Sequence, residues 1–215
     1  MKQAIIFTNG AYGSLDFYAQ YLEEKGPFDI IGCDGGINCI ARLGKTPVWM
    51  TGDMDSVDPA VLSAYMAKGI PADKHSTHKD ETDTELAVDY CLANHYERVV
   101  LCGASGSRLD HTLGNFYLLN KMLEAGIWAE TIDPVNRIFL MTDYCQLDVP
   151  VGSTVSIMAY TDKAEGITLE GFEYPVYNGM MDHLRPGYGI SNVTVAKKPE
   201  IWVKQGKLLV DIVTE

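Results

Sequence analysis

The sequence predicts an α/β fold, in which a mostly parallel sheet flanked by helices is followed by an antiparallel β-sandwich. In residues 1–126, short apolar runs alternate with longer stretches of helical periodicity, the pattern of a parallel sheet covered by helices. From residue 127 to 215 the apolar runs become short and alternating, and glycine, proline and asparagine separate them. We therefore expect two domains, 1–126 and 127–215, and a chain of 215 residues is long enough to give each a buried core.

Four apolar runs in the first part predict buried strands, and each precedes glycine, aspartate or asparagine: 3–8, 28–33, 47–51 and 97–102. Helical patterns follow them at 14–25, 36–43, 58–68, 83–95 and 110–125. Ser14, Asp58 and either Thr82 or Asp83 suit helix caps, and Pro59 suits a first helical turn. Because parallel strands end at one edge of a sheet, the polar residues that follow them should share one rim, where such folds bind ligands.

The second part contains four runs with strand-like alternation: STVSIMAY, GITLEGFEYP, GISNVTVA and IWVKQGKLLVDIV. In the last run, Gln205 and Gly206 separate two apolar stretches, which predicts a hairpin that turns at these residues. Ile201 and Val203 would then lie on one face of the first strand, with Trp202 on the other. Trp202 either packs in a core, the commoner role of a tryptophan in a sandwich, or stacks on a ring-shaped ligand.

The charge and composition oppose several classes of partner. A formal net charge of −12 and a pI near 4.8 argue against a surface for nucleic acid or anionic membranes, which requires clustered lysine and arginine. The sequence has no run of about 18 apolar residues to span a bilayer, and the apolar core of MKQAIIFTNG is too short for a signal peptide. The five cysteines are odd in number and lack CxxC spacing, which favours reduced thiols in the cytoplasm.

The stretch GDMDS at residues 52–56 places Asp53 and Asp55 one residue apart, directly after an apolar run. If the strand continues through them, both carboxylates project from the same edge and repel each other unless a cation lies between them. Magnesium prefers oxygen ligands and is commonly held by one or two carboxylates together with substrate phosphates. The pair therefore points to a magnesium site and to phosphate chemistry.

The segment KDETDTELA at residues 79–87 opens a helix at the same predicted rim. Thr82 or Asp83 caps this helix, or Asp83 supplies a third carboxylate ligand, and the two roles can fall to different residues. Lys79 either reaches a phosphate from its loop or is a solvated surface charge.

The segment GASGSRLDHTLGN at residues 103–115 joins a strand to a helix with small residues, which let backbone amides approach an anion. It lacks the GxxxxGK[ST] spacing of a P-loop. The planar fork of Arg108 suits bidentate phosphate binding, although surface ion pairing is the commoner role of an arginine. Asp110 could accept hydrogen bonds from an amine, act as a base, or cap the following helix.

Taken together, these motifs resemble those of the bacterial-type thiamine pyrophosphokinases, over nearly the whole chain. The likeness rests on the order and spacing of DGG at 34–36, GDMDS, KDETDTELA, GASGSRLDH, and the late segments GITLEGFEYP and GISN. It implies an ATP-binding catalytic domain at 1–126 and a domain at 127–215 that binds thiamine and forms a homodimer, with thiamine sites between the subunits. The implied reaction transfers a diphosphate group from ATP to the thiamine hydroxyl and releases AMP.

The resemblance also implies roles for matching residues in ATP binding. Three aspartates, Asp53, Asp55 and Asp83, would bind magnesium on the ATP phosphates. The residues expected to contact or surround ATP are Asn9, Asp34, Gly35, Lys79, Thr82, Ser105 and Arg108. Where the family often carries a further glycine, this chain has Ser107.

A second set of residues would bind thiamine according to the same resemblance. Asp110 and His111 would face thiamine, while Ser191 and Asn192 would approach it from the partner subunit. Trp202 would add an aromatic wall. Catalysis would then depend on the three metal-binding aspartates, on Arg108, and on Asp110.

Two other functions are compatible with parts of this pattern. A metal-dependent phosphoesterase acting on a small phosphorylated metabolite would use the clustered aspartates to activate water, and would hydrolyse phosphate without an acceptor. A nucleotide-binding regulatory module would bind a magnesium-bound ligand without turnover. The late SN motif and the β-sandwich favour the kinase, because neither alternative needs a second wall for an organic acceptor.

Overall fold

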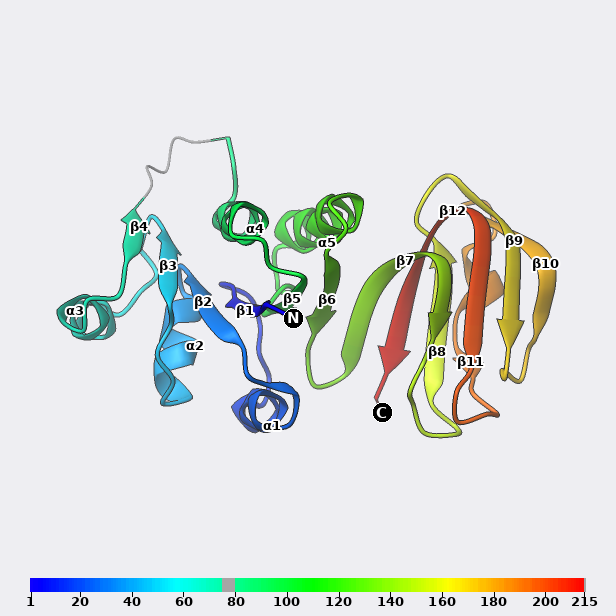
Figure 1. Cartoon of the computed structure of the whole chain (residues 1–215), viewed down its shortest axis with the longest axis horizontal. Helices are drawn as coiled ribbons and strands as arrows, with labels where there is room; N and C mark the ends of the chain where they lie inside the picture. Colours follow the sequence, from blue (N-terminus) through cyan, green and yellow to red (C-terminus); the bar gives the residue numbers. More distant parts are fainter. Residues whose placement is uncertain (75–79, 215) are drawn as a thin grey trace. The chain divides into compact units, whose positions relative to one another are not determined.

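The computed structural model describes residues 1–74 and 80–214, which form two compact units, Met1–Pro134 and Val135–Glu215. The first unit is a parallel α/β region and the second is antiparallel β structure (Figure 1). This confirms the predicted order of fold classes along the chain. No helix within the described ranges is long and apolar enough to cross a membrane.

The described part of the first unit contains a parallel sheet with the strand order β6-β5-β1-β2-β3-β4. Its strands are β1 (Gln3–Phe7), β2 (Asp29–Cys33), β3 (Trp49–Gly52), β4 (Ala72–Lys74), β5 (Arg98–Cys102) and β6 (Trp128–Ile132). From β1 the chain first extends the sheet through β2, β3 and β4, and then returns to the other side of β1 for β5 and β6. The strand order therefore reverses between β1 and β5, which is where open α/β sheets bind ligands.

Helices cover both faces of this sheet: α1 (Leu15–Lys25), α2 (Gly36–Arg42), α3 (Pro59–Ala67), α4 (Asp83–Ala93) and α5 (Leu109–Glu124). Figure 1 shows α4 and α5 on one face and α1 and α2 on the other. Side chains from β1 alternate between the two layers, and Ile5 and Phe7 pack in one buried cluster with Tyr18, Ile37 and Ile40. The four predicted strands and five predicted helices of this unit are thus confirmed to within a few residues.

Two strands of the first unit lie outside the pattern read from the sequence. β4 has only three residues, and β6 begins just after residue 127, where the sequence changes texture. Because β6 pairs in parallel with β5, the parallel sheet continues to Ile132, and the two compact units divide between Pro134 and Val135. The sequence WAETI hides this strand because Glu130 lies in its middle and is nevertheless fully buried.

The second unit is built around one long strand, β12 (Glu200–Val213), with β7 (Asn136–Gln146), β8 (Thr154–Ala159), β9 (Lys163–Glu170), β10 (Val176–Asp182), β11 (Asn192–Val193) and a 3-10 turn at Pro186–Gly189. The residues of β12 before Gly206 pair with β9 and β7, and those after it pair with β8 and β7. The predicted hairpin at Gln205-Gly206 is therefore wrong. Gly206 has a φ of +91° and lies within a register shift between Val203 and Leu208, so the turn-like residues mark a bulge within one strand.

A buried ion pair joins β5 to β6 in the first unit. The Nη2 atom of Arg98 lies 2.6 Å from Oε1 of Glu130, and the hydroxyl of Tyr21 donates to the same oxygen at 3.1 Å. Glu130 is fully buried and the Arg98 side chain is 19% exposed. Breaking such a pair leaves an uncompensated charge away from water, so each partner depends strongly on the other.

We predict that Glu130→Gln lowers the free energy of unfolding by about 3–5 kcal/mol, because the charge of Arg98 would remain without its carboxylate. Urea unfolding followed by circular dichroism measures this loss. The control is Glu85→Gln, which removes one partner of a half-exposed Lys121 that also pairs with Asp89, and should cost less than about 1 kcal/mol. Equal losses in the two variants would contradict the assigned role of the buried pair.

Candidate functional site

The loops after β1 and β5 are joined at the point where the strand order reverses. The amide of Ala11 donates to the Ser105 carbonyl at 2.7 Å, and the amide of Thr8 donates to the Cys102 carbonyl at 2.9 Å. Gly10 allows this approach, because a Cβ atom there would lie only 1.9 Å from the carbonyl oxygen of Gly103. This close contact brings two glycine-containing loops together beside the carboxyl ends of β1 and β5.

A pocket of about 860 Å³ opens next to this contact between the loops, entirely within the first unit. It is lined by the loops after β1, β2, β3 and β5 and by the first turns of α4 and α5. The predicted site residues that line it are Asn9, Asp34, Asp53, Thr82, Asp83, Ser105, Arg108 and His111. These eight residues, from separate loops and helix starts, therefore lie around one pocket.

Three carboxylates converge in this pocket. Asp34, Asp53 and Asp83 each offer an oxygen atom, and these oxygens all lie within 4.8 Å of one another. Asp34 is 7% exposed, and burial raises the pKa of its carboxyl group, with a further contribution from the charge of Asp53. A cluster of carboxylate oxygens fits a hard cation such as magnesium, which would relieve this repulsion.

Hydrogen bonds hold the carboxylate of Asp34 in place within the cluster. Its Oδ2 atom accepts from the side-chain amide of Asn9 at 2.7 Å, and its Oδ1 atom accepts from the Ser56 amide at 3.3 Å. Gly35 is required beside it, because a Cβ there would lie 1.9 Å from Oδ1 of Asn9. The sequence placed Asp34 near ATP and did not identify it as a candidate metal ligand, although it also follows a strand and could have been grouped with the aspartates of the next loop.

Asp55 does not join the three converging carboxylates. β3 ends at Gly52 and Met54 has a φ of +66°, so the assumption that the strand continues through both aspartates is wrong. The Asp55 amide donates to Oδ1 of Asp53 at 3.1 Å, and its exposed carboxylate accepts from the Ser56 hydroxyl at 2.9 Å. The left-handed residue turns the backbone, so the two carboxylates do not share one edge.

At the start of α4, the two roles that the sequence left open fall to two different residues. The Thr82 hydroxyl accepts from the Glu85 amide at 3.1 Å and caps the helix, while the carboxylate of Asp83 belongs to the cluster. Lys79 lies outside the described residues.

At the start of α5, Arg108 and Asp110 pair with each other. Nη2 and Nε of Arg108 donate to the two carboxylate oxygens of Asp110 at 2.6 and 3.3 Å, and the side chains are 69% and 66% exposed. The hydrogen bond from Arg108 lowers the pKa of Asp110 to about 2, so the carboxylate stays charged at neutral pH. Arg108 occupies the N-cap position, so Asp110 is not the N-cap residue. Its neighbour His111 lines the pocket.

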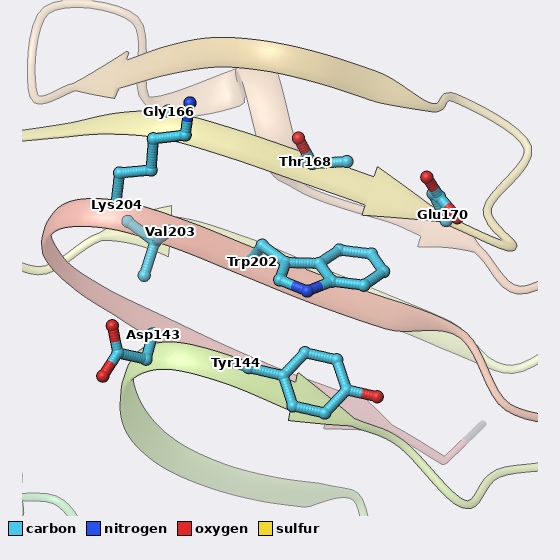
Figure 2. Close-up of a pocket in the computed structure, with 8 residues that line it drawn as sticks. All are labelled: Asp143, Tyr144, Gly166, Thr168, Glu170, Trp202, Val203 and Lys204. Carbon is cyan, nitrogen blue, oxygen red and sulfur yellow. The ribbon is translucent and has the colours of Figure 1, made fainter.

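The predicted site residues of the second unit lie in two different settings. Asn192 is buried, and its side chain exchanges two hydrogen bonds with the backbone of Tyr174, at 3.1 and 2.9 Å. Ser191 has a φ of +58°, and its amide donates to the Ser156 hydroxyl at 3.1 Å. Trp202 instead lies on the outer face of β12 beside Tyr144, with ring centroids 5.3 Å apart (Figure 2). Trp202 is therefore outside the core, and its aromatic partner Tyr144 was missed because the pairing of β7 with β12 cannot be read from the sequence.

Comparisons with known proteins match both units of the chain. The catalytic domain of thiamin pyrophosphokinase matches residues 21–129, and the vitamin B1 binding domain of thiamin pyrophosphokinase matches residues 144–209. The chain is similar to the thiamine pyrophosphokinase of Bacillus subtilis, with 31% identity over 182 residues that cover 83% of each protein.

Solved structures have the same fold. A crystal structure of thiamine pyrophosphokinase from Bacillus subtilis superposes with a TM-score of 0.88 at 25% identity, over 100% of both chains. The thiamin pyrophosphokinase from Candida albicans superposes with a TM-score of 0.83 at 16% identity, over 100% of this chain and 89% of that one, and supports the fold alone.

We predict that Gly10→Ala destabilises the protein by about 1–3 kcal/mol, because the new methyl group would force the loops after β1 and β5 apart. Thermal unfolding measures the change. Gly114→Ala is the matched control, since a Cβ at Gly114 in α5 meets no atom within 4 Å, and it should stabilise the helix by up to about 1 kcal/mol. An unchanged melting temperature in Gly10→Ala would show that the two loops do not pack closely at Gly10.

Proposed function

The chain belongs to the thiamin pyrophosphokinase family and transfers a diphosphate group from ATP to thiamine, and on that premise we propose where each substrate binds. The observation that supports this most strongly is the pocket at the ends of β1 and β5, in which three carboxylates converge and which Arg108 also lines. We place the ATP phosphates in this pocket, because metal-bridged phosphates are the ligands that such a set of oxygens and an adjacent guanidinium fit.

We propose that magnesium is held by Asp53, Asp55 and Asp83, with Asp34 as an additional ligand. The convergence of Asp34, Asp53 and Asp83 supports three of these assignments. Asp55 would have to turn away from the Ser56 hydroxyl to take part. When bound, the metal neutralises charge on the phosphate oxygens and fixes their orientation.

The remaining ATP contacts are proposed from the lining of the pocket. The backbone around Ser105 and the N-terminus of α5 suit an anion, because the first amides of a helix point outward and carry partial positive charge. Asn9 and Gly35 would act mainly by holding Asp34, and Thr82 by fixing the first turn of α4. We retain Lys79 as a candidate phosphate contact from the sequence.

In the reaction, the thiamine hydroxyl oxygen forms a bond to the β-phosphorus, and the bond from that phosphorus to the oxygen of AMP breaks. Such transfer depends mostly on positioning and charge stabilisation. We propose that Arg108 stabilises charge on the transferring group. Asp110 would face thiamine and, once the phosphates have taken Arg108 from it, could accept the hydroxyl proton. We also propose that His111, which lines the pocket, faces thiamine.

The second unit is proposed to complete the thiamine site as part of a homodimer, with sites between the subunits. Ser191 and Trp202 are the proposed contacts of this unit. Asn192 would act through Tyr174, since its side chain is buried and already bonds the Tyr174 backbone in both directions. We propose a cytoplasmic location, because all five cysteines are free thiols and four of them are buried.

The decisive experiment combines purified protein with ATP, magnesium and thiamine, and then separates the nucleotides from the thiamine species. We expect AMP and thiamine diphosphate in equal amounts, and only when thiamine is present. Release of ADP or phosphate without thiamine would instead support the phosphoesterase, and binding without turnover would support the regulatory module.

We predict that Asp53→Asn and Asp83→Asn each raise the magnesium concentration for half-maximal rate by at least about tenfold, because each removes a charged ligand. Direct titration with Mn²⁺, observed by electron paramagnetic resonance, should show the same loss of affinity without turnover.

Asp55→Asn should also impair turnover far more than Ser107→Gly, the control on the pocket wall. Equal turnover in these two variants at saturating magnesium would remove Asp55 from the metal site.

We also predict that a non-hydrolysable ATP analogue tightens thiamine binding by up to about fivefold, the upper limit for an exposed ion pair. The phosphates would take the fork of Arg108 and free the carboxylate of Asp110 for the cationic acceptor. Calorimetric titration of thiamine with and without the analogue measures this factor. It should fall in Arg108→Gln and persist in Ser107→Gly, whereas the same factor in Arg108→Gln would exclude exchange at this ion pair.

A further inference from the structure

The acidic loop, residues 53–58 between β3 and α3, is fastened to α2 by one side chain. The Nδ2 atom of Asn38 donates to the Ser56 carbonyl at 2.9 Å, and its Oδ1 atom accepts from the Asp58 amide at 2.9 Å. A carboxamide can make both bonds at once because its nitrogen donates while its oxygen accepts. Asn38 is half-buried in the first turn of α2, and it is not among the described residues that line the pocket.

Asp34, two residues before α2, bonds the same serine. Its Oδ1 atom accepts from the Ser56 amide at 3.3 Å, and its own amide donates to the Thr51 carbonyl at 3.0 Å, at the end of β3. Asp34 and Asn38 thus bond the amide and the carbonyl of Ser56, respectively. The backbone of the acidic loop is therefore held at Ser56, three residues after Asp53.

The first turn of α2 is a rigid base for these bonds because it packs closely against β1. A Cβ atom at Gly36 would lie 2.1 Å from the carbonyl oxygen of Phe7, an approach that only glycine permits. Ile37 and Ile40, on either side of Asn38 in the sequence, are both fully buried. Asn38 therefore links the acidic loop to a helix that is fixed against the sheet.

The acidic loop has little regular structure of its own to orient its aspartates. β3 ends at Gly52 and α3 begins at Pro59, so the residues between them belong to no strand or helix. Met54 and Val57 anchor the loop in the hydrophobic cluster of the first unit, but apolar contacts are not directional. The direction of the Asp53 carboxylate therefore depends on the hydrogen bonds that hold the loop backbone.

We propose that Asn38 is a positioning residue for the metal site. Its two bonds hold the acidic loop so that the carboxylate of Asp53 meets those of Asp34 and Asp83. This inference rests on the proposed function, which places magnesium on these carboxylates. Replacing a residue that orients a metal ligand typically weakens metal binding by about 10- to 100-fold.

The test measures the affinity of the full-length protein for Mn²⁺ by electron paramagnetic resonance, without nucleotide. Asn38→Ala removes both bonds to the loop and should weaken Mn²⁺ binding about tenfold. Asn94→Ala is the matched control, because Asn94 is also half-buried and its side chain donates to the Tyr90 carbonyl at 2.9 Å, at the far end of α4. This control should leave the Mn²⁺ affinity unchanged.

Asn38→Asp separates positioning from a simple effect of charge. The new carboxylate keeps the shape and can accept from the Asp58 amide, but it opposes the Ser56 carbonyl instead of donating to it. An added negative charge beside the acidic loop would by itself tighten the binding of a cation, whereas loss of the loop position weakens it. We expect weaker Mn²⁺ binding than in the unmodified protein, and tighter binding would overturn the proposal.

A double-mutant cycle identifies the aspartate through which Asn38 acts. In an Asp53→Asn background, adding Asn38→Ala should weaken Mn²⁺ binding much less than it does in the unmodified protein, because the ligand that Asn38 positions is already lost. In an Asp83→Asn background, where the missing ligand comes from α4, the full effect of Asn38→Ala should remain. Additive losses in the Asp53→Asn background would show that Asn38 does not act through Asp53.

Turnover provides a second measure of the same role. Asn38→Ala should raise the magnesium concentration for half-maximal rate, and the rate should recover at saturating magnesium, which a general loss of folded protein would not allow. If the unmodified protein binds no Mn²⁺, or forms no AMP and thiamine diphosphate, the proposed function fails. If it does both and Asn38→Ala binds Mn²⁺ as tightly as Asn94→Ala, the role of Asn38 alone is wrong.

Discussion

The close approach of the loops after β1 and β5 is the constraint on which the candidate site depends. Gly10 has no side chain to hold Gly103 and Ser105 away, and the hydrogen bond from Ala11 fixes the two loops against each other. The pocket opens where the strand order reverses, and the two loops that touch there form part of its wall. Asp34 and Asp53 follow β2 and β3, and Asp83 begins α4. Their carboxylates converge beside these loops because the parallel strands end at one edge of the sheet.

Burying a carboxylate in that opening is unfavourable by itself, and the structure shows how the cost is reduced. Asn9 and the Ser56 amide donate to Asp34, while Gly35 leaves room for Asn9. These bonds offset part of the desolvation that raises the pKa of the Asp34 carboxyl group. Among the described residues that line the pocket, Arg108 is the one lysine or arginine, so a metal on carboxylates and the amides of a helix terminus are the natural further means of binding phosphates.

Periodicity predicted most of the first unit because helices buried on one face and strands buried on both faces have distinct patterns. It failed where a buried polar residue or a single backbone torsion decides the outcome. Glu130 hid β6, Gly206 marked a bulge instead of a hairpin, and the left-handed Met54 separated Asp55 from Asp53. The same torsions decide which predicted ligands meet, so motif spacing identified the acidic loops but could not choose between Asp34 and Asp55.

The opposite charges of the two substrates explain why the candidate residues fall into two chemically different sets. ATP is a polyanion and suits metal, amides and the fork of Arg108, whereas thiamine carries a cationic ring and suits aromatic faces and carboxylates. A single surface that carried both cationic groups for ATP and carboxylates for thiamine would pair its own opposite charges. Arg108 and Asp110 do pair in this way, and Arg108 lines the pocket that we propose for ATP. Exchange of that internal pair for two bonds to oppositely charged ligands would keep either charge from being left alone and would couple the binding of one substrate to the other.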